Sequence, residues 1–132
     1  SGLVFSEDEL KILLPCPMLE RLPAAAPEQW NSTAQLLAEG PLADAQSVAL
    51  VPVGNLPNNQ IEQLQQALVA ALGNRELLVS RDLLASRTCS TQLLVTASGA
   101  PQRQQLQQLR EQLALQGTPL AGWLLIDPTL EA

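Results

Sequence analysis

The stretch from Gly54 to Ile61 follows a continuous apolar run and is the place where phosphate chemistry would be expected. A phosphate-binding loop reads G-x-x-x-x-G-K-[ST], because glycine lets backbone amides wrap a phosphate, lysine neutralises it and a hydroxyl holds Mg²⁺. Only Gly54 matches this pattern, since Asn59, Gln60 and Ile61 replace the second glycine, the lysine and the hydroxyl. We therefore expect no ATP–Mg²⁺ binding, no cofactor and no catalytic residue here.

Carboxylates offer the next possible chemistry. Asp44, Asp82 and Asp127 could converge near strand ends and bind Mg²⁺, but they have no close spacing pattern and the chain has no histidine. The acidic triplet of residues 7–9 follows Ser6 in a capping-box pattern, so it suits the first turn of a helix better than a cation. We expect no metal site.

Nucleophilic catalysis lacks a base of the histidine type for any of the candidate hydroxyls. Cys89 lies close to Arg87, which could lower its thiol pKa, but a structural cysteine is the simpler interpretation. Cys16 and Cys89 are expected to be buried free thiols, and Trp30 and Trp123 to be core residues. The serines considered and set aside are Ser80, Ser86, Ser90 and Ser98.

Apolar runs alternate with amphipathic segments over most of the chain, which predicts strands separated by helices and therefore a mainly parallel sheet with helices on both faces. The expected fold class is a three-layer α/β sandwich with four or more strands. Buried residues in the middle of these strands should include Leu50, Val79, Leu94 and Leu125. The sequence predicts strands at 47–53, 76–80, 92–96 and 120–126, and helices that begin near Ser6, Pro27, Asn59 and Pro101.

Residues 1–26 are interpreted as an N-terminal helix and a proline-rich arm, and residues 27–132 as the α/β domain, within a single compact domain overall. The arm, from Pro15 to Pro23, carries three prolines and the apolar Met18, Leu19 and Leu22. Prolines lower the entropy lost on docking, so we expect the arm to pack against the domain, within the chain or on a neighbouring subunit.

Composition excludes several partners. The net charge is −6 and the seven Lys and Arg are scattered singly, which argues against nucleic acid and anionic lipid surfaces. No apolar run approaches a membrane span and no export signal is visible, so we expect a cytoplasmic location without direct membrane insertion. The leucine spacing in the glutamine-rich segment from Gln102 to Gln116 indicates the solvated face of a helix, with a partner-binding face or a prion-like tract as the alternatives.

Residues 14–23, 77–84 and 93–127 each follow a pattern that occurs in one family. These three segments resemble the cytoplasmic part of bacterial tyrosine autokinases and the related polysaccharide co-polymerases. Residues 14–23 are similar to the family's arm "LGxPxLGxIP", and 77–84 to its strand "LLIDxDLR", with Ser80 in place of the first aspartate. Residues 93–127 are similar to its closing "VxLVxxxG…GxPxxGxVLN", with Asp127 at the asparagine position. No segment resembles the Walker B strand "VIIDTPP", and the tyrosine-rich tail has no counterpart because the chain contains no tyrosine.

This resemblance implies a P-loop-NTPase-like but degenerate fold without ATP chemistry, in other words a pseudokinase-like domain and not an enzyme. It implies a non-catalytic regulatory or assembly domain of a protein that controls exopolysaccharide or lipopolysaccharide chain length and export, with membrane segments upstream and a protein partner or self-association. The alternative is a small nucleotide-binding or enzymatic α/β domain with an unrecognised site. The sequence argument against that alternative is Gln60, because a triphosphate site would need a cation within reach and none is nearby in sequence.

Overall fold

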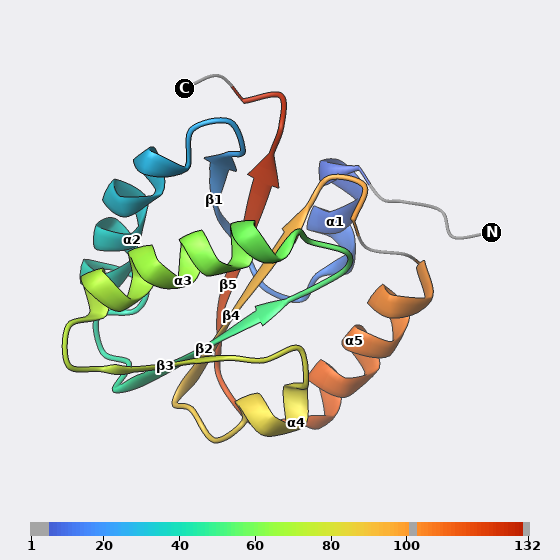
Figure 1. The fold of residues 1–132 in the computed structure, drawn as a ribbon. Coiled ribbons are helices and arrows are strands. Elements are labelled where there is room, and N and C mark those ends of the chain that lie inside the picture. The colour runs from blue at the N-terminus through green and yellow to red at the C-terminus, as the bar shows by residue number, and fades with distance from the viewer. Residues whose placement is uncertain (1–5, 101–102, 131–132) are drawn as a thin grey trace.

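A computed structural model describes residues 6–100 and 103–130, and its centre is a parallel sheet of five strands (Figure 1). The spatial order is β1-β5-β4-β2-β3, and every neighbouring pair is parallel. The expected α/β class with a mainly parallel sheet is therefore confirmed. The strands are β1 (Met18–Pro23), β2 (Ser47–Pro52), β3 (Glu76–Val79), β4 (Thr91–Ala97) and β5 (Leu120–Asp127).

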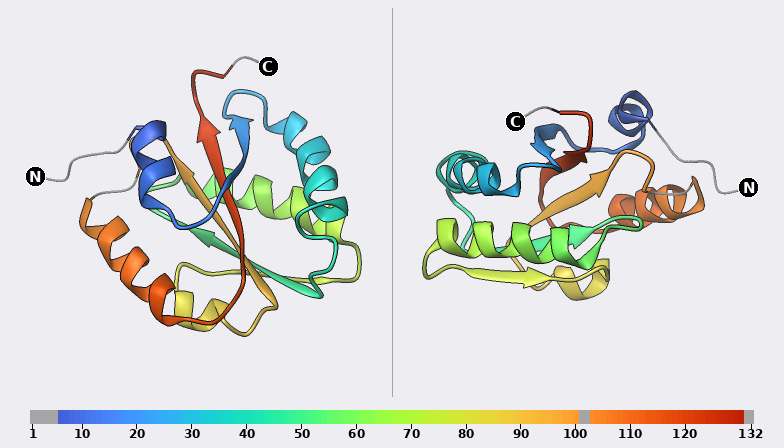
Figure 2. Two further views of the ribbon diagram at one scale, coloured as in Figure 1. Left: turned by 180° about the vertical axis from the view of Figure 1, so that it is seen from behind. Right: turned by 45° about the horizontal axis from the view of Figure 1, so that its top comes forward.

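Helices cover both faces of the sheet and complete the expected three layers, as the two views in Figure 2 show. One face carries α2 (Trp30–Glu39), which follows a 3-10 turn η1 (Pro27–Gln29), and α3 (Asn58–Leu72). The other face carries α1 (Glu7–Leu13), α4 (Leu83–Ser86) and α5 (Arg103–Leu115). Within the described residues, no helix combines the length and the apolar character needed to cross a membrane.

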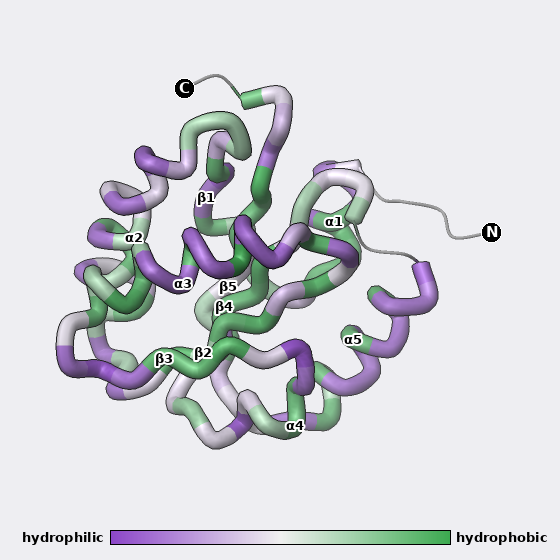
Figure 3. The backbone as a smooth tube through the Cα atoms, viewed as in Figure 1, coloured by the Kyte–Doolittle hydropathy of each residue, from purple (hydrophilic) through white to green (hydrophobic). Residues whose placement is uncertain are grey.

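Alternation along the strands divides the core between the two faces. In β4, Leu93 and Val95 pack against α2 and α3, whereas Leu94 packs against the other helices. In β5, Leu124 packs against α2 and α3, whereas Trp123 packs against the helices of the other face. Figure 3 shows the result: the central strands are largely hydrophobic, and α5 is mostly hydrophilic along its length. The leucines of α5 that were expected to face inward are buried: Leu106, Leu109 and Leu113.

The segment expected to be an arm is extended, but it is itself an edge strand of the sheet. As β1 it pairs in parallel with β5, and Leu22 is fully buried in the same cluster as Trp30. Packing within the chain is thus confirmed, and the fifth strand comes from residues assigned to the arm. The close approach of this segment to β5 depends on Gly122, whose φ is +149°. The N–H of the next residue, Trp123, donates to the carbonyl of Pro17 at 2.9 Å.

Local expectations were wrong at three places. Val79 is only half-buried, since β3 is an edge strand, whereas Leu50, Leu94 and Leu125 are buried as expected. Asn59 was expected to cap the helix α3, but α3 begins at Asn58 after Pro57, so Asn59 lies in its first turn. The short helix α4 was not predicted from the sequence. The predicted helix start at Pro101 lies outside the described residues.

The strand order places a topological switch point between β2 and β4. The chain leaves β2 through α3 towards β3, and leaves β4 through α5, on the opposite face, towards β5. If β2 is counted as the first strand, then β3-β2-β4-β5 has the order 2-1-3-4, which begins flavodoxin-like doubly wound sheets. The strand β1 lies where the fifth strand of such a sheet would stand. Because ligands of such sheets bind beyond the carboxyl ends of the strands at the switch point, the loop after β2 is the place to examine.

Candidate functional site

The loop after β2 is tied down by internal hydrogen bonds. The Asn55 N–H donates to the carbonyl of Ala100 at 3.3 Å, across the switch point, and the Leu56 N–H donates to the carbonyl of Gly54 at 3.1 Å. The buried hydroxyl of Thr96 donates to the carbonyl of Val53 at 2.9 Å. A phosphate-binding loop needs its amides directed at the ligand. Here two of these amides already have protein acceptors.

The positions that would complete a phosphate-binding loop have structural roles. Ile61, at the place of the Mg²⁺-binding hydroxyl, is half-buried and packs against the core beneath α3. The N–H groups of Gln60 and Ile61 both donate to the carbonyl of Pro57, which forms the first turn of α3. The start of α3 therefore offers an apolar side chain where that hydroxyl would stand.

A cation does lie close to Gly54 in space, although none is nearby in sequence. The guanidinium Nη1 of Arg81, two residues beyond the end of β3, donates to the carbonyl of Gly54 at 2.6 Å. Both residues line a cleft of about 200 Å³ between the carboxyl end of β2 and α5. The signal that could have found Arg81 is its place just after a strand, where ligand-binding residues of parallel sheets gather.

The three aspartates do not converge. Asp44 precedes β2, at the amino ends of the parallel strands. Asp82 follows β3 and Asp127 ends β5, so both lie at the carboxyl ends. Strands β3 and β5 are three strand spacings apart, roughly 14 Å. The Asp82 carboxylate accepts from the Leu84 N–H at 3.0 Å and the Asp127 carboxylate from the Thr129 N–H at 2.9 Å. Within residues 6–100 and 103–130, no three metal-binding side chains cluster.

The acidic triplet begins α1 as the sequence predicts. Ser6 and Glu9 form a capping box, with the Glu9 N–H donating to the Ser6 hydroxyl at 3.4 Å. Glu7 bridges Arg21 on β1 and Lys11 on α1, and the hydrogen bond from Arg21 is the main cause that lowers the pKa of the Glu7 carboxyl. Glu7 thereby links α1 to the edge strand β1, whereas Glu9 caps its own helix.

The thiols and hydroxyls that were considered also have structural environments. Both cysteines are free, but Cys16 is only half-buried and not buried as expected. Its partial burial raises the pKa of the Cys16 thiol to about 11, which keeps it protonated at neutral pH. Cys89 is buried. The Ser86 hydroxyl is fully buried and donates to the carbonyl of Asp82 at 2.8 Å. The hydroxyl of Ser90, just before β4, donates to the carbonyl of Ser47, the first residue of β2, at 2.8 Å. Trp30 and Trp123 are core residues, as expected.

The chain between β3 and β4 consists of α4 and turns, so no strand stands there that could correspond to a Walker B strand. Comparison with protein-family models, with curated proteins and with solved structures finds no match to this chain. The fold is thus established by strand order and burial, and arguments about function depend on the surfaces and loops described above.

Proposed function

We propose that this chain is a non-catalytic regulatory or assembly domain that acts by self-association, within a protein that controls exopolysaccharide or lipopolysaccharide chain length and export. The family part of this proposal rests on the resemblance of residues 14–23, 77–84 and 93–127 to polysaccharide co-polymerases. The engaged amides of Asn55 and Leu56 support the non-catalytic part, since they have protein acceptors in the loop where triphosphate would bind.

The observation that carries the assembly role is an exposed apolar corner where α4 meets the end of α5. Leu84 and Leu115 are 69% and 88% exposed, the latter being the most exposed large apolar residue in the described structure. Together with Asp82 and Arg87 they line a hollow of about 260 Å³. We call these four residues the corner surface. Contiguous apolar groups rimmed by charges mark interaction sites.

Charge on the corner surface favours a second copy of the chain as the occupant. Asp82 and Arg87 place one acid and one base on the same patch. A two-fold interface brings the same patch from both subunits together, so that each acid can face the other subunit's base. A patch that carries both signs around an apolar centre is self-complementary in this sense, whereas a patch of one sign would repel its copy.

Sedimentation velocity between low and high micromolar concentration tests this assignment. Wild-type protein is expected to form a dimer as concentration rises, and Leu84→Gln and Leu115→Gln are each expected to weaken it by about tenfold or more, as loss of a central apolar contact does. Both side chains are exposed, so stability should change by no more than about 0.5 kcal/mol.

Leu36→Gln is the matched control, because Leu36 is 67% exposed and lies on α2, on the opposite face of the sheet. It should leave the association unchanged. A wild-type chain that stays monomeric at every concentration, or a control that weakens the dimer as much as Leu84→Gln, refutes the corner surface as the interface.

A further inference from the structure

The cleft beside the switch point has an apolar floor and a polar rim. Its floor comes from Val51 and Val53, at the end of β2, and from Leu109 on α5, all of them buried. Its rim is formed by Arg81 and by glutamines of α5. The exposed lining is more polar than apolar, so the cleft suits a small polar ligand better than an apolar one.

Arg81 is an exposed side chain that one hydrogen bond ties to the cleft, so its other donors face the solvent side of the opening. A guanidinium has five N–H donors, and one donates from Nη1 to the Gly54 carbonyl. No other acceptor for Arg81 exists within residues 6–100 and 103–130, and the ion pairs in this part of the chain join Glu7 to Lys11 and Arg21. The bond to Gly54 therefore fixes the guanidinium at the cleft while its positive charge has no carboxylate partner there.

The glutamines of the rim lie on one face of α5. Gln105, Gln108 and Gln112 are spaced by three and four residues, which places them one above another along the helix. Each carboxamide offers both a donor and an acceptor, which suits hydroxyl groups. The polar character of this helix face, interpreted from the sequence as a solvated surface, thus coincides with the opening of the cleft.

The geometry points to a binding site for a small hydroxylated anion, in which Arg81 holds one carboxylate or phosphate group and the glutamines bind the hydroxyls. The volume of about 200 Å³ corresponds to roughly seven water molecules at about 30 Å³ each, below the size usual for nucleotide-sized ligands. This site goes beyond the proposed self-association: neither Leu84 nor Leu115 lines the cleft, although Leu83 and Gln112 line both the cleft and the neighbouring hollow of the corner surface.

Nuclear magnetic resonance titration of the whole chain with D-glycerate, and separately with inorganic phosphate, tests the site against sodium chloride at equal ionic strength. We expect saturable shifts of the Gly54 and Arg81 amides and of the rim carboxamides, with a dissociation constant of about 1–10 mM for at least one probe. Tighter binding of glycerate identifies a hydroxy acid as the ligand class, and tighter binding of phosphate identifies a phosphate ester.

Arg81→Gln should weaken the binding by about tenfold or more, since it removes a charge-assisted hydrogen bond. Gln108→Ala should weaken it by a smaller factor, and because Gln108 is exposed this variant keeps the fold even if Arg81→Gln does not. Arg110→Gln, on α5 but outside the cleft, is the matched control and should bind as wild type does. Equal shifts with chloride, no saturation by either probe up to about 20 mM, or full binding by a folded Arg81→Gln variant overturns the assignment.

Discussion

Gly122→Ala is expected to lower the free energy of unfolding by about 2–6 kcal/mol, the sum of backbone strain and overpacking. The φ of Gly122 is +149°, a backbone conformation that residues other than glycine rarely adopt. An added Cβ would lie 2.6 Å from the Pro17 carbonyl oxygen. A second contact at 2.6 Å, with Cγ of Leu19, affects a side chain that can move, but the carbonyl belongs to the backbone that enters β1. Urea denaturation followed by circular dichroism measures the loss.

Gly117→Ala is the matched control for this variant. Gly117 has no atom within 4 Å of an added Cβ and no positive φ, so its replacement should change stability by about 0.5 kcal/mol or less. The double variant Gly122→Ala/Leu19→Ala should regain little, because the clash with the Pro17 carbonyl remains. Equal losses for Gly117→Ala and Gly122→Ala would show that β1 does not approach β5 as closely as described.

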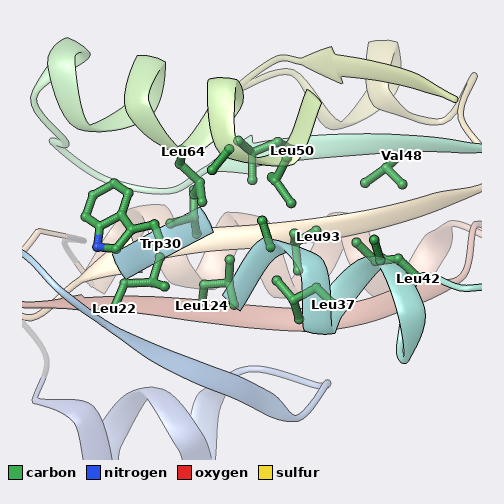
Figure 4. Packing of buried hydrophobic residues seen from close by; sticks show 14 of the residues in the cluster. Leu22, Trp30, Leu37, Leu42, Val48, Leu50, Leu64, Leu93 and Leu124 are labelled. Carbon is green, nitrogen blue, oxygen red and sulfur yellow. The ribbon is translucent and has the colours of Figure 1, made fainter. Parts of the chain in front are cut away.

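Trp30→Ala is expected to cost about 3–5 kcal/mol, the range for removing a large aromatic side chain from a core. Trp30 is fully buried at the start of α2 and packs with Leu22 of β1 and Leu124 of β5, as Figure 4 shows. Its indole Nε1 donates to the carbonyl of Pro23 at 2.9 Å. The residue therefore joins α2 to the edge of the sheet, and thermal or urea unfolding measures what this contact contributes.

Trp30→Phe separates the volume of the indole from its hydrogen bond. The carbonyl of Pro23 still accepts from the Ala26 N–H at 3.2 Å, so the loss of the indole donor should cost only about 0.5–1.5 kcal/mol, besides a small change in packing. If Trp30→Phe costs as much as Trp30→Ala, the hydrogen bond and not the burial of the ring dominates, and the packing account of this edge is wrong.

Patterns within single segments predicted most of the fold. Strands and helices followed from alternation and spacing, since Leu93, Leu94 and Leu106 are buried where those periods place them. The role of Met18–Pro23 was harder to predict, because three prolines obscured a strand signal and the partner strand β5 lies a hundred residues away. The burial of Val79 was predicted wrongly for a related reason. The hydrophobic pattern shows that a residue lies in a strand, but only the strand order shows that the strand lies at the edge of the sheet.

The site was less predictable because it depends on contacts between distant segments. Arg81 reaches Gly54 across 27 positions of sequence, and no local pattern encodes that pairing. Arg75 is similar, since its Nη1 donates to the carbonyls of Leu42 at 2.7 Å and Ala45 at 3.1 Å and so ties the loop before β2 to the end of α3. The sequence identified the residues missing from a phosphate loop, but not the cation that approaches it from another strand.

Calorimetric titration of the wild-type chain with ATP–Mg²⁺ tests most directly the claim that this domain acts by contact and not by nucleotide chemistry. The Asn55 and Leu56 amides are occupied, Ile61 replaces the Mg²⁺-binding hydroxyl, and the cleft at Arg81, about 200 Å³, is smaller than usual ligand pockets. We expect no saturable heat from millimolar nucleotide. Saturable binding with a dissociation constant below about 100 µM, or about 5.5 kcal/mol on the affinity scale, would contradict the account.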